Sequence, residues 1–294
     1  MAQSPPGKPF DNILNFRDIG RFVNARSLRK LKEGLFFRSA RPDEASPSDR
    51  TTLLTQHALK TIIDLRTKSE HIAAAQKRSS HISSAPAASP SNALAATPLQ
   101  IPGLAYENIN LNGPAYSSAL IRQLPYTSTL RLAALMAFGY RNQAISILGR
   151  QVMAQRGLSG LAIDTLTHSV TEIRAVFAVL GDREAWPVLV HCTQGKDRTG
   201  LVVLLVLLLL GAGTEVVDQD YMHSQAELGP EREEKLKEVR AFGMPDSFAD
   251  CDPKWTRKVG EWIGERGGVE RYLESIGVGK DVRERVREIL LEKG

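Results

Sequence analysis

Cysteine is scarce in this sequence, with only Cys192 and Cys251 among 294 residues. Two cysteines cannot form the disulfide framework that stabilises small secreted domains, so we exclude that class. Hydrophobic residues make up 42% of the chain, which is enough to bury a core without crosslinks. We therefore expect a protein that folds unaided in a reducing compartment, the cytoplasm, where a thiol can stay reactive.

Long hydrophobic runs are also lacking. The most apolar stretch is LVVLLVLLLL at residues 201–210, and the uncharged span around it, residues 199–214, is shorter than the roughly 20 residues that a membrane helix needs. The first ten residues contain no apolar segment behind a basic start, so we expect no secretory signal there. We interpret the leucine-rich run as a buried core helix.

Acidic residues are absent from residues 114–163, although the chain as a whole is close to balanced. The formal net charge of +5, from 38 basic and 33 acidic residues, is too small for a protein that coats nucleic acid. We expect no nucleic-acid partner, but a bias toward anionic ligands. The acid-free segment carries five arginines, which are Arg122, Arg131, Arg141, Arg150 and Arg156.

Short apolar runs predict the strands of an α/β fold. The runs ILNFRDIG (13–20) and LFFRS (35–39) are broken by charged residues and glycine, as strands and turns are. The β-branched run TIIDL (61–65) has the length of a strand buried on both faces, with Asp64 near its C-terminal end. PVLVH (187–191) predicts a further buried strand just ahead of the leucine-rich helix.

The rest of the chain, which we expect to form a single domain over residues 1–294, divides by composition. Residues 71–103 are rich in Ala, Ser and Pro without apolar periodicity, so we predict a disordered insertion there. Residues 114–180 are rich in Leu, Ala, Ile and Met, which predicts two to four helices broken near Pro125, Gly139 and Gly157. Alternating charges predict amphipathic helices over residues 231–240, 254–266 and 281–293.

The chemistry is indicated by a cysteine, Cys192, that is followed six residues later by Arg198, with Gly195 between them. This segment lies after a predicted strand and before a predicted helix. Backbone N–H groups, the helix N-terminus and the guanidinium all favour a nucleophilic thiolate at Cys192. The same donors can bind the non-bridging oxygens of a phosphate monoester, to which the arginine presents a planar fork. The pattern predicts a nucleophile in a phosphate-binding loop.

The other loop residues have expected roles of their own. The Thr199 hydroxyl can donate to the sulfur when the thiolate departs, and His191 is expected to brace the loop rather than act as the base. Glycine permits a tight turn around phosphate. The residues expected to contact the substrate are Thr193, Gln194, Gly195, Lys196 and Gly200. For the lysine, the alternative is an exposed, solvated side chain. Cys251 has no partner motif, so we expect it to be structural.

The loop HCTQGKDRTG (191–200) resembles the signature loop of the protein tyrosine phosphatase superfamily. Its GKDRT ending, with NFRDIG (15–20), FRS (37–39) and IDLR (63–66) in that order, resembles the microbial branch of atypical tyrosine and phosphoinositide phosphatases. The resemblance implies an α/β fold with a central sheet flanked by helices, and a covalent cysteinyl-phosphate intermediate formed without metal or cofactor. It implies phosphotyrosyl proteins or phosphoinositides as partners, without ranking the two. Only the insertion and the helical segment fall outside it.

The general acid is not settled by the loop. Many superfamily members use an aspartate of a mobile Trp-Pro-Asp loop, but here Trp186-Pro187 is followed by Val188. Two carboxyls could take the role, Asp197 within the loop and Asp64 at the end of its strand, since either could lie within reach of the departing oxygen. The resemblance favours Asp197, and we keep Asp64 as the alternative.

Other functions remain open. A pseudophosphatase would keep the pocket as a binding module for phosphorylated ligands, and a sulfur-transfer or arsenate-handling enzyme could use a similar loop. The acid-free segment is expected to be either a helical hairpin packed on the core or a lid whose arginines meet phosphopeptides or acidic headgroups. Because Arg131, Arg141 and Arg150 do not share one helical face, a helix lying along a membrane is disfavoured, and peripheral membrane contact stays an alternative. The sequence does not indicate the oligomeric state.

Overall fold

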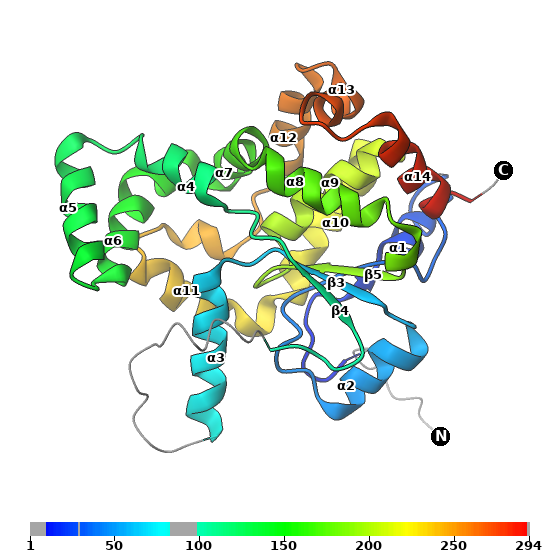
Figure 1. Ribbon diagram of the computed structural model, residues 1–294, viewed down its shortest axis with the longest axis horizontal. Helices are drawn as coiled ribbons and strands as arrows, with labels where there is room; N and C mark the ends of the chain where they lie inside the picture. The colour runs from blue at the N-terminus through cyan, green and yellow to red at the C-terminus, as the bar shows by residue number, and fades with distance from the viewer. Residues whose placement is uncertain (1–9, 29, 83–98, 293–294) are drawn as a thin grey trace.

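The computed structural model describes residues 10–28, 30–82 and 99–292. A five-stranded sheet in the order β1-β2-β5-β3-β4 lies at its centre, with helices packed against it (Figure 1). The α/β fold with a central sheet flanked by helices, which the sequence predicts, is confirmed. The strands are β1 (Arg17–Asp18), β2 (Phe36–Ser39), β3 (Thr61–Asp64), β4 (Ala105–Asn108) and β5 (Val188–His191).

The sheet gathers the ends of its central strands at one edge. Strands β2, β5, β3 and β4 are parallel, whereas β1 is antiparallel to β2. The register pairs His191 with Ser39 on one side and with Asp64 on the other. Because parallel strands share a carboxyl edge, the loops after β2, β3 and β5 leave the sheet at the same place, where open α/β sheets bind their ligands.

The central strands are buried because their side chains pack into a hydrophobic cluster on each face of the sheet. Ile62 and Leu189 belong to the smaller cluster, whereas Ile63 and Val190 belong to the larger one, as the alternation of strand side chains requires. Helix α9 (Asp197–Leu209) is buried along nearly its whole length in the larger cluster. The leucine-rich run is therefore a core helix, as expected. In the described part of the chain, no helix is long and apolar enough to cross a membrane.

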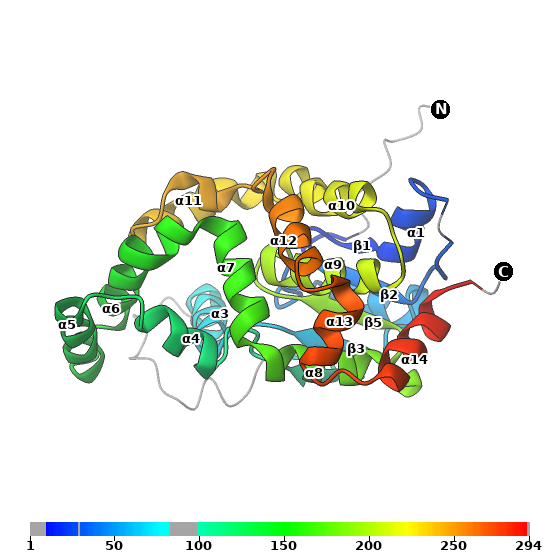
Figure 2. The same cartoon turned by 90° about the horizontal axis from the view of Figure 1, so that it is seen from above.

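The charged C-terminal third forms the amphipathic helices that the sequence predicts. Their apolar faces carry residues such as Trp255, Tyr272 and Val286 into the larger cluster, beside α9. Helices α12 to α14 lie together on one side of the molecule (Figure 2). The bounds are α10 (Thr214–Glu227), α11 (Arg232–Ala241), α12 (Trp255–Gly264), α13 (Gly268–Ser275) and α14 (Lys280–Leu290), with α1 (Ile19–Asn24) and α2 (Pro47–Thr51) near the N-terminal end.

Residues 114–180 contain more helices than the two to four expected. The described segment holds α4 (Pro114–Ile121), α5 (Tyr126–Ala137), α6 (Arg141–Leu148), α7 (Ala154–His168) and α8 (Val170–Leu180), with a π-helical turn over Gly149–Met153. The breaks fall where the sequence places them. Pro125 precedes α5, and the positive φ angles of Gly139 and Gly157, +81° and +63°, end α5 and kink α7.

The insertion expected to be disordered over residues 71–103 is partly helical, so that prediction was wrong for its first residues. Helix α3 (Lys68–Ile82) runs through them. Its start is capped reciprocally, since Glu70 accepts a hydrogen bond from the Thr67 N–H (2.9 Å) and donates its own N–H to the Thr67 hydroxyl (3.3 Å). The alanines that follow have high helix propensity. Residues 83–98 lie outside the described residues.

A buried ionic network joins the N-terminal strand to helix α10. Asp220 accepts from Arg17 Nε at 2.7 Å and also pairs with Arg38, and all three side chains are less than a tenth exposed. Arg38 in turn donates to the Gly195 carbonyl at 2.5 Å. Burial opposes ionisation of Asp220, but the two guanidinium groups outweigh it and lower the pKa of this carboxyl. The network thus couples the chain's first strands to the loop after β5.

Replacing Asp220 by Asn should lower the free energy of unfolding by about 3–5 kcal/mol, because a neutral side chain leaves two buried guanidinium groups without a counter-charge. The matched control is Asp246→Asn, whose partner Arg240 is exposed, so its loss should not change stability measurably. Urea unfolding followed by circular dichroism measures both variants. Similar losses in the two would contradict the role given to the buried network.

Candidate active site

The loop at residues 191–200 is curled tightly against the neighbouring strand. Gly195 has a φ of +64°, and a Cβ at this position would lie 2.0 Å from the Ser39 carbonyl oxygen, so only glycine fits. The Asn15 side-chain amide donates to the Gln194 and Gly195 carbonyls, both at 3.0 Å. These contacts, with the one from Arg38, hold the loop backbone in its curled form.

Cys192 and Arg198 meet in a cavity of about 190 Å³. Arg198 Nη1 and Nη2 donate to the two carboxylate oxygens of Glu70 at 2.7 and 2.5 Å, and the Thr193 hydroxyl donates to the same carboxylate. Burial opposes both charges, but their mutual attraction lowers the pKa of Glu70 and raises the pKa of Arg198. The guanidinium is therefore held charged and in a fixed orientation within the same cavity as the thiol.

The cavity has a polar floor and mostly apolar walls. The floor is formed by the loop, and Asp197 lines it together with the cysteine and the arginine. Helices α4, α7, α9 and α11, the π-helical turn and the turn after α11 supply the walls, to which Asn112, Thr165 and Lys235 contribute polar side chains. The apolar wall residues are Tyr116, Met153, Leu158, Leu161, Ala162, Leu201, Val239, Met244 and Phe248. An anion-binding floor beneath apolar walls is suited to a phosphate carried by an aromatic ring.

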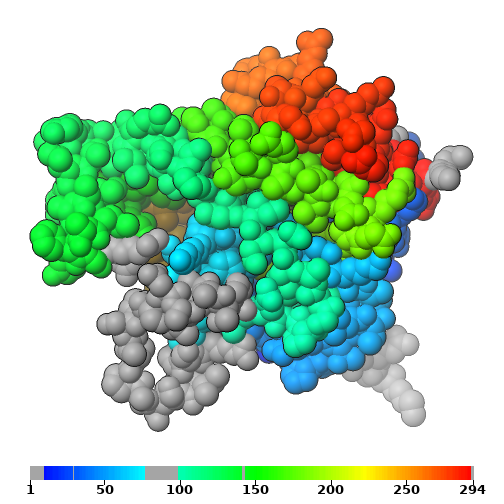
Figure 3. Space-filling view, in the orientation of Figure 1, coloured from blue at the N-terminus to red at the C-terminus, as the bar shows by residue number. Residues whose placement is uncertain are grey.

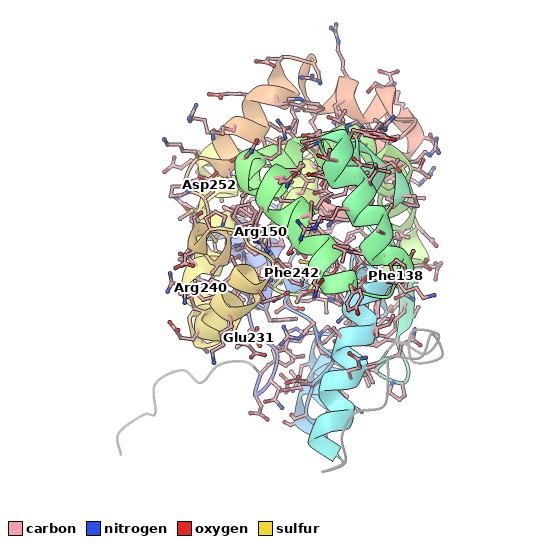
Figure 4. All side chains as sticks on the ribbon, turned by 90° about the vertical axis from the view of Figure 1, so that its left-hand side faces the viewer. Phe138, Arg150, Glu231, Arg240, Phe242 and Asp252 are labelled. Atoms are coloured by element: carbon pink, nitrogen blue, oxygen red, sulfur yellow. The ribbon has the colours of Figure 1, made fainter. Side chains whose placement is uncertain are left out.

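The outer wall depends on a close contact between two distant segments. A Cβ on Gly149, in the π-helical turn, would lie 2.2 Å from the Phe242 carbonyl oxygen, and one on Gly243 would lie 2.3 Å from the Arg150 side chain. Figure 4 shows Arg150 and Phe242 close together at this contact. The segment that supplies α7 is thereby joined to the turn after α11, and both contribute a methionine to the cavity.

Asp197 stands within the cavity and is about a third exposed, at 36%. It accepts a hydrogen bond from the Tyr221 hydroxyl at 3.2 Å. Tyr221 stacks on Trp255 with ring centroids 4.4 Å apart, and burial raises the pKa of its phenol well above the usual value. A rigid, protonated tyrosine therefore orients this carboxyl.

Asp64, the alternative general acid, is not among the residues that line the cavity. It is 1% exposed and accepts from Arg66 Nε and Nη2, the latter at 2.7 Å, while His191 Nε2 lies 3.4 Å away. Burial alone would raise the pKa of Asp64, but the charge of His191, which is protonated only at acid pH, and the Arg66 fork outweigh burial and lower it to about 2. A buried carboxylate that stays ionised at neutral pH has no proton to donate.

The remaining loop residues divide between the cavity and the scaffold. Thr193 and Gln194 line the cavity, as expected of substrate contacts. Lys196 does not: it is 1% exposed, and its amine donates to the Phe248 and Asp250 carbonyls at 3.2 and 2.7 Å. The expected substrate contact by this lysine is replaced by a tether between the loop and the segment after α11.

Three further residues of the loop, His191, Thr199 and Gly200, are buried. The hydroxyl of Thr199 finds no hydrogen-bond partner within the described part of the chain, and a Cβ on Gly200 would lie 3.3 Å from the Tyr221 ring. His191 Nδ1 lies 3.1 Å from the Cys192 carbonyl oxygen, and burial lowers the pKa of His191, so a neutral imidazole braces the loop. Burial raises the pKa of Cys251 to about 12, which suits a structural thiol.

Glu70 is the site residue that the sequence reasoning missed. The pattern Thr67-x-x-Glu70 signals a helix start, but nothing in it indicates that the carboxylate reaches Arg198. Among the described residues, no group of three or more His, Cys, Asp or Glu side chains is arranged to hold a metal ion.

Because Asp64 is ionised in the folded protein, part of the free energy of unfolding should be lost at acid pH. Its folded-state pKa of about 2 lies below the ordinary 3.8. Ionised Asp64 therefore stabilises the fold above about pH 4, and about 2 kcal/mol is lost as the pH falls to about 2. Urea unfolding of the wild type and Asp64→Asn should show a stability difference that shrinks over this window. A difference that stays constant with pH would contradict the assignment.

Comparison with known proteins adds three relatives. The triple specificity protein phosphatase PtpB of Mycobacterium tuberculosis is 32% identical over 124 residues, which are 36% of this chain and 44% of that protein. A tyrosine-protein phosphatase of Nostoc commune is 28% identical over 158 residues, 47% of this chain and 53% of that protein. A Cupriavidus necator protein, named only provisionally as a tyrosine-protein phosphatase, is 25% identical over 287 residues, 90% of this chain and 81% of that protein.

The chain spans about half the length of the first two relatives. A family model described as the tyrosine phosphatase family, in contrast, matches residues 8–292. The family resemblance that the loop suggests is confirmed by this match. The chain belongs to the tyrosine phosphatase family.

Proposed function

We propose that the protein is a cysteine-dependent phosphatase that hydrolyses phosphate monoesters of tyrosine. The observation that carries the proposal is the placement of Cys192 and Arg198 at the floor of a cavity whose walls are mostly apolar. A phosphotyrosine places its dianionic group and its ring in these two environments. The names of the relatives, which are those of protein phosphatases, support the same reaction class.

The geometry supports a two-step mechanism. The Cys192 thiolate attacks phosphorus, the ester bond breaks, and Asp197 gives its proton to the departing phenolate oxygen. Arg198 binds the non-bridging oxygens, and Glu70 keeps its planar fork aimed. Water then attacks the cysteinyl-phosphate, returns a proton to Asp197 and releases inorganic phosphate. The hydroxyl of Thr199, unpartnered within the described residues, is free to donate to the sulfur as the thiolate departs.

Phosphoinositides are the second substrate class. A neighbouring cavity of about 200 Å³ shares Glu70, Thr193, Gln194 and Lys235 with the first and adds Arg41. Lys235 and Arg41 could meet further phosphates. Arg41 is paired with Glu231, however, and Lys235 with a glutamate of its own helix. Because these cations are already neutralised, we rank phosphotyrosine first. A reducing, cytoplasmic location would keep the thiol active.

The pseudophosphatase alternative is less well supported. A module that binds without turnover would need to lack one of the reacting groups, and Cys192, Arg198 and Asp197 all line the same cavity. We propose that the lid-like role of the acid-free segment is limited to α4, the π-helical turn and α7, which line the cavity. Of its arginines, Arg150 packs on Gly243 and Arg156 binds Asp164, and none with a described side chain lines either cavity.

Cys192→Ser should abolish turnover of an aryl phosphate yet still bind a phosphotyrosyl peptide, because the curled backbone and the Arg198–Glu70 pair survive. Steady-state kinetics and isothermal titration calorimetry measure the two properties. Cys251→Ser is the matched control and should stay active, since that thiol lies outside the cavity. Activity near the wild-type level in Cys192→Ser would disprove the mechanism.

Asp197→Asn should reduce turnover of phenyl phosphate by about 10²–10⁴, but that of p-nitrophenyl phosphate far less, since only the poor leaving group needs a proton. Asp64→Asn should change both rates by the same factor, because Asp64 acts through the scaffold. The ratio of the two rate constants separates the roles. If Asp197→Asn leaves that ratio unchanged, the general acid is another group.

A further inference from the structure

Exposed hydrophobic side chains are concentrated on one helical hairpin, which we define as α5, α6 and the turn between them, residues 126–148. Among the described residues, six large hydrophobic side chains are exposed, and only Leu28 lies elsewhere. The most exposed of the other five are Tyr126 at 77% and Phe138 at 79%. The hairpin members are Tyr126, Leu130, Met136, Phe138 and Tyr140. Isolated exposed side chains need no explanation, but a contiguous group does.

The outer face of α5 is apolar where a solvated helix would be polar. Exposed positions 126, 130, 133, 134 and 137 recur at helical spacing and hold Tyr, Leu and three Ala. The opposite face contains Leu132, which packs on a small cluster formed by α4 and the π-helical turn. No residue of α5 is fully buried. The helix is thus apolar on both its inner and its outer side, which indicates that something covers the outer one.

The hairpin is accessible because it stands at one end of the molecule. Figures 1 and 2 place α5 at the extremity opposite the C-terminal helix α14. The space-filling view shows α5 and α6 as a projecting surface (Figure 3). Phe138 lies at the end of α5, away from the contact that Arg150 makes with the turn after α11 (Figure 4).

The charge around this face selects an anionic partner. The sequence has no acidic residue between positions 114 and 163, and the exposed Arg122 and Arg131 precede and flank the apolar face. A second copy of the chain would bring the same positive charges together, which disfavours self-association. Aromatic side chains at both ends of α5 suit the boundary between headgroups and acyl chains. With 12 residues, the helix is too short to cross a bilayer and would lie along its surface.

We infer that the α5–α6 hairpin docks on the surface of an anionic lipid bilayer, with the outer face of α5, Phe138 and Tyr140 in the interface and the arginines at the headgroups. The spacing of the arginines disfavours a membrane-lying helix, but the apolar side chains, not the arginines, define the docking face. This inference does not depend on the phosphatase reaction, because binding can be measured without turnover.

Flotation of the full chain with vesicles tests it. The wild type should bind vesicles of phosphatidylcholine and phosphatidylglycerol and bind pure phosphatidylcholine vesicles much more weakly. The double variant Leu130→Ser, Phe138→Ser should lose about tenfold in affinity for the mixed vesicles. Arg131→Gln should weaken binding at low salt only, because surface charge is screened. Leu28→Ser, at the exposed hydrophobic outside the hairpin, is the matched control and should bind as the wild type does.

Two further measurements check that the double variant is folded and that position 138 enters the lipid interface. The double variant should hydrolyse a soluble aryl phosphate at the wild-type rate, which shows that it is folded. In Phe138→Trp the fluorescence should shift to the blue only when mixed vesicles are added. Absence of vesicle binding, or equal binding by the double variant, would overturn the inference. So would a concentration-dependent dimer in light scattering that the double variant loses, because the face would then be a protein contact.

Discussion

The close approach of Gly195 to the Ser39 carbonyl is the constraint on which the site depends. Because the backbone at this position lies where a Cβ would collide, the loop after β5 is pressed against the end of β2. Arg38 and Asn15 then bind the carbonyls on this turn, and Asp220 neutralises Arg38. The loop is therefore held against the sheet by the same ionic network that joins β1 and β2 to α10.

Three carboxylates near the loop have different roles because their surroundings differ. Asp64 is locked by Arg66 in a place without access to the cavity. Glu70 is bound to Arg198 in an ion pair. Its carboxylate therefore orients the guanidinium and does not transfer a proton. Asp197 accepts a hydrogen bond from a tyrosine hydroxyl, lies 3.6 Å from the Lys196 amine and lines the cavity. Separate environments for chemically similar groups are what acid–base catalysis requires.

The acid-free segment also divides into two parts with different surroundings. Its second half, from the π-helical turn through α7, closes against the turn after α11 and walls the cavity. Its first half ends in a hairpin whose apolar face has no counterpart in the described fold. One acid-free segment of the sequence thus supplies a wall of the candidate active site and the surface that we infer to meet lipid.

The sequence by itself determined four of the five strands, the core helix and the family, and it predicted the nucleophile and arginine of the loop, because these depend on local patterns: β-branched runs, fixed offsets and an apolar stretch. It gave no signal for β4. Only the tertiary structure decided that Glu70 holds Arg198, that Lys196 is a tether and that Asp64 is locked, because each depends on a partner far along the chain or on burial. The helix over residues 71–82 and the exposed face of α5 were likewise decided only by the tertiary structure. The sequence tells which side chains are present. Burial and contacts in the folded chain decide whether those side chains pack in the core or stay exposed to bind a partner.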